Sequence, residues 1–289
     1  MSTTMTPPPA PPTTGYPASD PWPGGPIRSS SRTVAIVASV VGGVIALGAL
    51  TIGTVQVLAN SNRHSETYRV AVDGVTDLDL DFSSGEMLVT FADVDEAVLD
   101  VRDSSSVGEW TLRVEGDELI AESPSGGFMF GWFNRSGDVT LTLPKELEGM
   151  NADLDIGAGS LEVEGAFSTL TVDLGAGDVE VRGIATDVTA DISAGDAELD
   201  LMDVQSADLS VSAGRLVAVS GGDAPESIDA SVSAGDIELT VPDGRYDVTS
   251  SVSAGDFDNS IGSDPGASNR IHVQVSAGSA TLDGGAAGR

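Results

Sequence analysis

The stretch DLGAGDVEV, residues 173–181, decides the fold because the sequence repeats it, as DISAGDAEL at 191–199 and SVSAGDIEL at 231–239. Counting every [Ser/Gly]-Ala-Gly triplet gives seven copies, spaced by 18, 18, 19, 21, 20 and 23 residues. Their last glycines are Gly159, Gly177, Gly195, Gly214, Gly235, Gly255 and Gly278. Such a period is typical of proteins in which one unit stacks on the next and buries a shared core. The sequence therefore predicts a β-solenoid with repeats of 18 to 23 residues.

Each copy carries a fixed apolar frame when its residues are counted from the Ala-Gly glycine as position zero. Positions −5 and −3 are mostly apolar, as are +2 and +4; around Gly177 these are Val172, Leu174, Val179 and Val181. The inward frame thus changes from odd to even positions at the glycine. Because side chains alternate strictly along a strand, this change predicts a bulge or corner at each glycine. Glycine allows a positive φ there, and we expect the preceding alanine on the crowded inside of the corner.

Alternating apolar residues also precede the repeats, and they predict strands with one buried face. Residues 83–89 resemble a diverged first copy of the repeat, and Gly116-Asp117 predicts a hairpin turn into the strand that follows. No soluble helix longer than two turns is expected. The predicted strands are 68–72, 78–82, 98–101, 110–114 and 139–144, the last ended by Pro144.

The charge of the chain restricts its partners. The formal net charge is −32, and Asp20 is the only acidic residue before residue 60. Such a surface repels phosphate backbones, so nucleic acid is not an expected partner; it attracts cations and basic proteins. The absence of cysteine from the sequence excludes disulfides and thiolate-bound metals.

The N-terminal part predicts a membrane anchor. Residues 1–32 are rich in proline and are predicted to be a disordered tail, with a polyproline ligand as the alternative. Residues 33–59 carry no charge, and about 27 residues at ~1.5 Å each can cross a ~30 Å hydrocarbon core. Arg28 and Arg32 precede this stretch, which favours a cytoplasmic N-terminus. A signal-peptidase site ending at Ala59 is the alternative. We expect residues 60–67 to be a linker and residues 68–285 to form the extracytoplasmic β-repeat domain.

An aromatic segment interrupts the alternation. Four of the chain's few aromatic residues fall between residues 128 and 133, flanked by glycine and serine. They either fold back to close the end of the core, or form an exposed patch for a partner protein or the bilayer surface. The predicted interaction patch is Phe128, Phe130, Trp132 and Phe133.

No convincing catalytic set is present in the sequence. His272 stands at position −6 of the last copy, which faces outward, and His64 lies beside the predicted span. A serine nucleophile therefore has no histidine base nearby, and there is no Gly-x-Ser-x-Gly elbow, phosphate loop or dinucleotide fingerprint. We therefore predict a protein that is not an enzyme, with no small-molecule substrate and no cofactor.

Outward acidic positions are the one chemical feature with a mechanism. Positions +1 and +3 are acidic in most copies, and a parallel register would stack them about 4.8 Å apart. Carboxylates at that distance repel unless they are screened or bridged, and their oxygens suit Ca²⁺. The alternatives are a calcium ladder and a solvated acidic face that keeps the protein soluble. The ladder would consist of Asp178, Asp196, Asp236 and Asp256 at +1 with Glu180, Glu198 and Glu238 at +3.

The sequence resembles actinobacterial proteins of the DUF4097 adhesin-type family, which is related to head-domain and LiaF-type β-repeat proteins. The resemblance rests on the proline-rich tail, the single span, the Gly-Trp-Phe loop, the strand at 139–144 and the Gly-Asp-Val-Glu-Val units. It implies a toast-rack β-solenoid over about residues 68–283 and carries over no catalytic residues. Arg215 and Val217 depart from the acidic pattern, so a distorted coil is expected there.

These observations predict a single-pass membrane protein whose extracytoplasmic β-solenoid is an interaction scaffold, such as an adhesin. The alternative is an accessory sensor of cell-envelope stress that contacts a membrane kinase or anti-sigma partner. In either case the expected partner is a cell-surface or envelope protein. A secreted hydrolase would require a buried histidine–carboxylate pair, which the register of His272 does not supply.

Overall fold

A computed structural model describes residues 65–102, 109–124 and 138–285, which lie within one compact unit, Gly48–Arg289. Over these residues the chain is all-β, as predicted, and its one helical segment is the short 3-10 helix Lys145–Leu147. No helix in these ranges is long and apolar enough to cross a membrane. The predicted tail, span, most of the linker and the aromatic patch at 128–133 lie outside the described residues.

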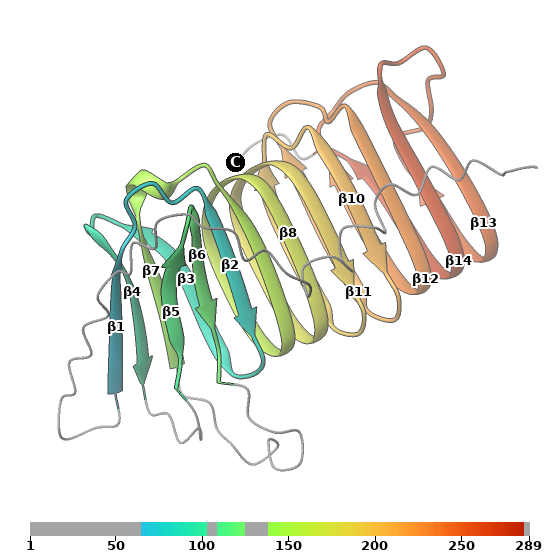
Figure 1. The fold of residues 1–289 in the computed structure, drawn as a ribbon. Coiled ribbons are helices and arrows are strands. Elements are labelled where there is room, and N and C mark those ends of the chain that lie inside the picture. Colours follow the sequence, from blue (N-terminus) through green and yellow to red (C-terminus); the bar gives the residue numbers. More distant parts are fainter. Residues whose placement is uncertain (1–64, 103–108, 125–137, 286–289) are drawn as a thin grey trace, which may run out of the picture. The chain divides into compact units, whose positions relative to one another are not determined.

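In the described residues, fourteen strands form one continuous sheet that wraps around a single core (Figure 1). The N-terminal strands are β1 (Ser65–Ala71), β2 (Asp77–Phe82), β3 (Glu86–Ala92), β4 (Glu96–Arg102), β5 (Thr111–Glu115), β6 (Glu118–Glu122) and β7 (Asp138–Pro144). The repeat strands are β8 (Met150–Ile192), β9 (Asp196–Met202), β10 (Ser206–Val211), β11 (Arg215–Gly221), β12 (Ser227–Val241), β13 (Tyr246–Asn259) and β14 (Asn269–Gly284).

The repeats pair in parallel and in register, so equivalent residues of successive copies lie side by side. Asp178 pairs with Asp196, and Val181 with Leu199. On the other side of the corner, Leu209 of β10 pairs with Ala190 of β8 and with Ala230 of β12. Positions −5, −3, +2 and +4 are buried in every copy except the one in β13. The predicted change of inward frame at the glycine is therefore confirmed.

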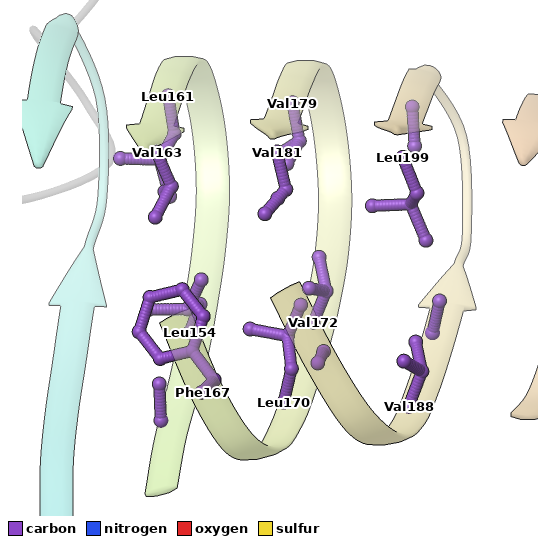
Figure 2. Packing of buried hydrophobic residues seen from close by; sticks show 14 of the residues in the cluster. Leu154, Leu161, Val163, Phe167, Leu170, Val172, Val179, Val181, Val188 and Leu199 are labelled. Carbon is purple, nitrogen blue, oxygen red and sulfur yellow. The ribbon is translucent and has the colours of Figure 1, made fainter. Parts of the chain in front are cut away.

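The core is built from these stacked inward positions. Figure 2 shows Leu161 and Val163 beside Val179, Val181 and Leu199 of the following copies. On the facing side of the core, Leu154 and Val172 occupy the same frame before the corner, and Phe167, Leu170 and Val188 lie near them. Branched aliphatic side chains suit such a ladder because each one packs on the equivalent side chain above and below.

The corner glycines are required by close contact between backbones. A Cβ on Gly177 would collide with the carbonyl oxygen of Gly159 and stand 2.7 Å from its nitrogen; one on Gly278 would meet Gly235 in the same way. Both residues also have positive φ, 113° and 120°. The expectation for the alanine is wrong: Ala176 and its equivalents are exposed, because the bulge turns position −1 to the outside.

The longer spacings are absorbed at the second corner of each repeat, away from the Ala-Gly triplet. Extra residues form the connections 203–205, 222–226, 242–245 and 260–268, while the paired segments keep their register. Arg215 to Val219 pair continuously with both β9 and β12. The expected distortion of this copy is therefore wrong, since an outward arginine or valine does not disturb the inward frame.

The order of stacking departs from the order of the chain at the last copy. β14 lies between β12 and β13, and it pairs in parallel with both. All inward positions of β14 are apolar, whereas β13 has Ser250 at −5 and Asn259 at +4. Burying that hydroxyl and that amide without partners would cost free energy, so the more polar copy occupies the end.

The N-terminal strands close the opposite end of the sheet. β3 pairs with β8, placing Glu86 beside Ser160, so residues 83–89 are a diverged first copy as predicted. β1, β4 and β7 continue from β3, with β1–β4 and β4–β7 antiparallel. The hairpin β5–β6 is also antiparallel, and Trp110 before it stacks on Phe82 at 6.2 Å between ring centroids.

One inward position in the repeats holds a polar side chain. Ser220 on β11 is buried, and its Oγ has no hydrogen-bond partner among the described residues. It lines a cavity of about 30 Å³ together with Leu199, Leu209 and Ile228. A buried hydroxyl without a partner is destabilising, so this copy contributes less to stability than its neighbours.

Replacing Gly177 by alanine should destabilise the protein by at least about 3 kcal/mol, because the new Cβ adds a backbone collision to an unfavourable φ. Thermal or denaturant unfolding of the purified chain measures this loss. Gly74→Ala is the matched control: Gly74 has φ +80°, but a Cβ there meets nothing within 4 Å. The control should lose only about 1 kcal/mol, and equal losses in the two variants would contradict the contact argument.

Candidate functional site

Two outward surfaces flank each Ala-Gly corner. We call the outward residues before the triplet, at −4 and −6, the pre-corner face, and those after it, at +1 and +3, the post-corner face. Both are lined by carboxylates because parallel in-register pairing brings equivalent positions together. The two faces differ in how many other residues separate their carboxylates and in how many of these carboxylates are paired with arginine.

The predicted acidic ladder lies on the post-corner face but is interrupted. At position +1, Asp178 pairs with Asp196, but Arg215 separates Asp196 from Asp236. Ser279 then separates Asp236 from Asp256, because β14 is inserted between β12 and β13. At position +3, Glu180 pairs with Glu198, and Val217 and Thr281 break the row beyond them.

Arginines also neutralise part of the post-corner face. The Arg182 guanidinium reaches Glu162 at 3.4 Å and is ion-paired with Glu180. Arg215 is ion-paired with Glu238. Over the described ranges no group of three or more histidine, aspartate or glutamate side chains is arranged to hold a metal ion. Of the predicted calcium ligands, only Asp178–Asp196 and Glu180–Glu198 are direct neighbours.

A denser cluster lies on the pre-corner face. Asp81 pairs with Asp155 on one side and with Glu122 on the other, and Asp79 pairs with Asp153. Asp173 and Asp191 follow at the equivalent position of the next two copies, and Asp208 lies two residues before Ser210, the neighbour of Asp191. We call this set the acidic wall: Glu122, Asp79, Asp81, Asp153, Asp155, Asp173, Asp191 and Asp208.

The carboxylates of the acidic wall repel one another. Partial burial raises the pKa of Asp173, and the charges of Asp191, Asp153 and Asp155 raise it further. Burial is the largest cause that raises the pKa of Asp153, and the charge of Asp79 is the next largest. The pKa values of Asp79, Asp81 and Asp208 are raised in the same way, burial being the largest cause and neighbouring carboxylates the next.

Arg113 relieves this repulsion at one end of the wall. Its guanidinium contacts Glu122 at 2.7 Å and Glu115 at 2.8 Å. Its charge lowers the pKa of Asp79, against the larger effect of burial. The ion pairs found in the described part of the chain leave Asp153, Asp173, Asp191 and Asp208 without a basic partner. A partner that supplies positive charge would therefore lower the energy of this surface.

The remaining predicted residues fall elsewhere. His272 is exposed, as predicted, and lies between Asp229 and Thr249, whose Oγ1 is 3.0 Å from its Nδ1. The other histidine and the aromatic patch Phe128, Phe130, Trp132 and Phe133 are outside the described residues.

The acidic wall was not predicted from the sequence, although its aspartates occupy positions −4 and −6. The repeated Gly-Asp motif marks only the positions after the glycine. Contributions from β2 and β6, which lie far away in sequence, could be added only once their pairing with β8 was known.

Acidification from pH 7.5 to about 5 should raise the melting temperature. The folded-state pKa values in the wall lie above the unfolded value of about 3.9, so the folded protein binds protons more readily over that range. The gain ends near pH 4, where Asp77, whose pKa is lowered by hydrogen bonds from Thr76 and Asn151, acts in the opposite direction. A melting temperature that falls steadily from pH 7.5 to 5 would count against this account.

Neutralising one wall residue should also be stabilising. Asp173→Asn removes repulsion from its neighbours and should raise the melting temperature by about 1–3 °C at pH 7.5 and low salt. Asp95→Asn, at an exposed aspartate between β3 and β4, makes the same change in net charge outside the wall. Thermal unfolding of both variants separates local repulsion from total charge, and equal shifts would refute the local explanation.

Comparison with known protein families gives one match. The profile of the Toastrack DUF4097 family matches residues 132–282, more than half of the chain. Among curated proteins, no relative matches.

Three solved structures share similarity over most of the chain. A proposed adhesin from Bacteroides fragilis is 17% identical, with a TM-score of 0.44, covering 77% of this chain and 98% of that one. A proposed lipid-binding protein from Parabacteroides distasonis is 15% identical (TM-score 0.41; 79% and 96%). A proposed cell adhesion protein from Clostridium sporogenes is 10% identical (TM-score 0.32; 78% and 100%). With the family profile spanning the corner repeats of β8 to β14, the chain belongs to the Toastrack DUF4097 family.

Proposed function

We propose that this protein is a membrane-anchored, extracytoplasmic and non-catalytic scaffold whose acidic wall binds a basic partner at the cell envelope, as an adhesin would. The observation that carries the proposal is the unneutralised row of carboxylates on an in-register parallel sheet. A rigid sheet holds these charges at fixed spacing, which a flexible acidic tail cannot do.

The repeat strands are best understood as coils of a β-solenoid. Support comes from their parallel pairing, from the one-to-one correspondence of triplets along β8 to β14, and from the absorption of extra residues at one corner. In a solenoid each coil contacts mainly its neighbours, so the outward rows can be extended or altered without rebuilding the core.

Anchoring follows from the N-terminal sequence. The charge-free residues 33–59 are long enough to span a bilayer, and Arg28 and Arg32 favour retention of the N-terminus in the cytoplasm. The domain from residue 68 to 285 would then lie outside the membrane, joined by the linker 60–67. Its acidity would keep it from lying on anionic lipid headgroups.

Charge complementarity identifies the partner as basic. Raised pKa values in the wall mean that its carboxylates are ionised at a cost, and lysine or arginine side chains of a partner would relieve it. Such contacts are strengthened by long-range steering and weakened by salt. A surface protein with a basic face meets this requirement; an anionic polymer does not.

The alternative function is an accessory sensor of envelope stress. It is motivated by the aromatic residues 128–133, which would contact a membrane partner. In that case the wall would be dispensable for signalling, whereas Trp132 would be essential. The two functions therefore predict different sensitive residues.

The chain should cross the membrane once with its N-terminus inside. Because it has no cysteine, Ser2→Cys and Ser279→Cys introduce unique thiols in the tail and on the post-corner face. In intact cells an impermeant thiol reagent should label the variant at residue 279 and leave the one at residue 2 unlabelled until the cells are opened. Labelling of both, or recovery of a chain cleaved after Ala59, would contradict the anchor.

Neutralising the wall should weaken binding to a basic peptide. The triple variant Asp173→Asn, Asp191→Asn, Asp208→Asn should bind a lysine-rich peptide about tenfold more weakly at low salt, a change of about 1.4 kcal/mol. The matched control carries the same charge change on the post-corner face: Asp178→Asn, Asp196→Asn, Asp236→Asn. Titration calorimetry with the purified full chain measures both, and equal weakening would show that only total charge matters.

The same variants discriminate the two functions in cells. For an adhesin, the wall variant should reduce cell attachment while Trp132→Ala leaves it unchanged. For a sensor, Trp132→Ala should abolish the envelope-stress response while the wall variant retains it. Both readouts are scored in cells that display equal amounts of the protein.

A further inference from the structure

Among the described residues, the outer edge of β13 pairs with no strand at the end of the sheet. β13 pairs with β14 and with no other strand of the described residues, and Figure 1 shows it as the outermost strand on that side. Residues 249–256 are all exposed. A free edge presents backbone N–H and C=O groups on which another strand can pair.

The inward side chains of β13 lack the cover that their equivalents have. Val252 occupies position −3 and is 43% exposed, whereas the other residues at this position are at most 2% exposed. Phe257 occupies position +2 and is only partly buried, while its equivalents are at most 4% exposed. The equivalents at −3 are Phe82, Ile156, Leu174, Ile192, Val211, Val232 and Val275.

Polar residues surround this apolar pair. Ser250 at −5 and Asn259 at +4 replace the apolar residues found there in the other copies. An apolar centre with a polar rim is the arrangement found in protein interfaces. The strand from residue 246 to 259 also lacks proline and lysine, which natural edge strands use to prevent pairing.

The shape of the edge restricts what can cover it. β13 carries the Ala-Gly corner, with Ala254 and Gly255 beside Ala277 and Gly278 of β14, so a straight strand cannot pair along its whole length, whereas a strand with the same corner can. At the opposite end of the strand order the edge strand is β1, a seven-residue strand without an Ala-Gly triplet. The matching segment within this chain is β13 itself, taken from a second molecule.

We propose that two copies of this chain dock end to end through antiparallel, two-fold pairing of their β13 strands, centred at the Ala254–Gly255 corner. This register places Val252 of each copy opposite Phe257 of the other, so that each covers the other's exposed apolar surface. It also places Asp256 opposite Ser253 and Asp258 opposite Ser251, and so avoids like charges directly opposite one another. The inference goes beyond the proposed function and does not depend on it.

The register is tested by cysteine crosslinking in the full chain, which has no cysteine of its own. Directly opposite residues of an antiparallel pair have Cα atoms about 4.5–5.5 Å apart, within the range of a disulfide. Purified Val252→Cys and Phe257→Cys proteins are mixed in equal amounts and oxidised in detergent solution. A crosslinked dimer should form in the mixture and be about tenfold less abundant with either protein alone.

A second cysteine pair tests the same register without replacing the inward residues Val252 and Phe257 of the end strand. Ser251→Cys mixed with Asp258→Cys changes only exposed residues and should crosslink in the same way. The matched control is Ile184→Cys mixed with Phe257→Cys, because Ile184 is 45% exposed but lies in β8, outside β13. Crosslinking of both β13 pairs and not of the control supports the interface.

Two outcomes overturn the proposal. The first is failure of both β13 pairs to crosslink at any protein concentration that oxidation permits. The second is equal crosslinking of the Ile184 control, which indicates random collision. The first outcome overturns the proposal even where the protein sediments as a dimer, because that dimer is then held through other residues.

Discussion

Contact between glycine backbones at the Ala-Gly corner is the constraint on which the rest of the structure depends. At Gly177 and Gly278 the adjoining copy lies so close that no side chain can intervene. This contact aligns the corners of successive copies, and the alignment fixes the parallel register of the strands on both sides. Once register is fixed, apolar positions fall on apolar positions and a continuous core results.

The same register that builds the core accumulates charge outside it. A single aspartate at an outward position would be harmless on an isolated strand. Repeated at the same place in successive copies, it lies beside its equivalents, as Asp81 lies beside Asp155. Stability and surface chemistry are thereby coupled: the order that buries Leu154 and Val172 also brings Asp155 and Asp173 together. Arg182 and Arg215 moderate this effect on the post-corner face, whereas on the pre-corner face Arg113 does so only at one end of the wall.

Local pattern predicted the architecture well because the frame is local. The change of parity at Gly177 was readable from nine residues, and it correctly identified the buried positions of most copies. Features that depend on distant segments were not predictable in this way. The adjacency of Glu122 and Asp81 requires the pairing of β6 with β2, and the separation of Asp236 from Asp256 requires the insertion of β14. The exposure of Ala176 was misjudged because the bulge turns its position outward.

The position of β14 restricts the order in which the last strands can fold. From β8 to β12 each copy can dock on a copy that precedes it in the chain, so folding of this part can follow the emergence of the chain. β13 breaks this sequence, since its only described strand partner lies C-terminal to it. It must wait, with Val252 and Phe257 uncovered, until residues 269–284 arrive and enter between it and β12. Closure of the last two copies therefore cannot begin before almost the whole chain has been synthesised.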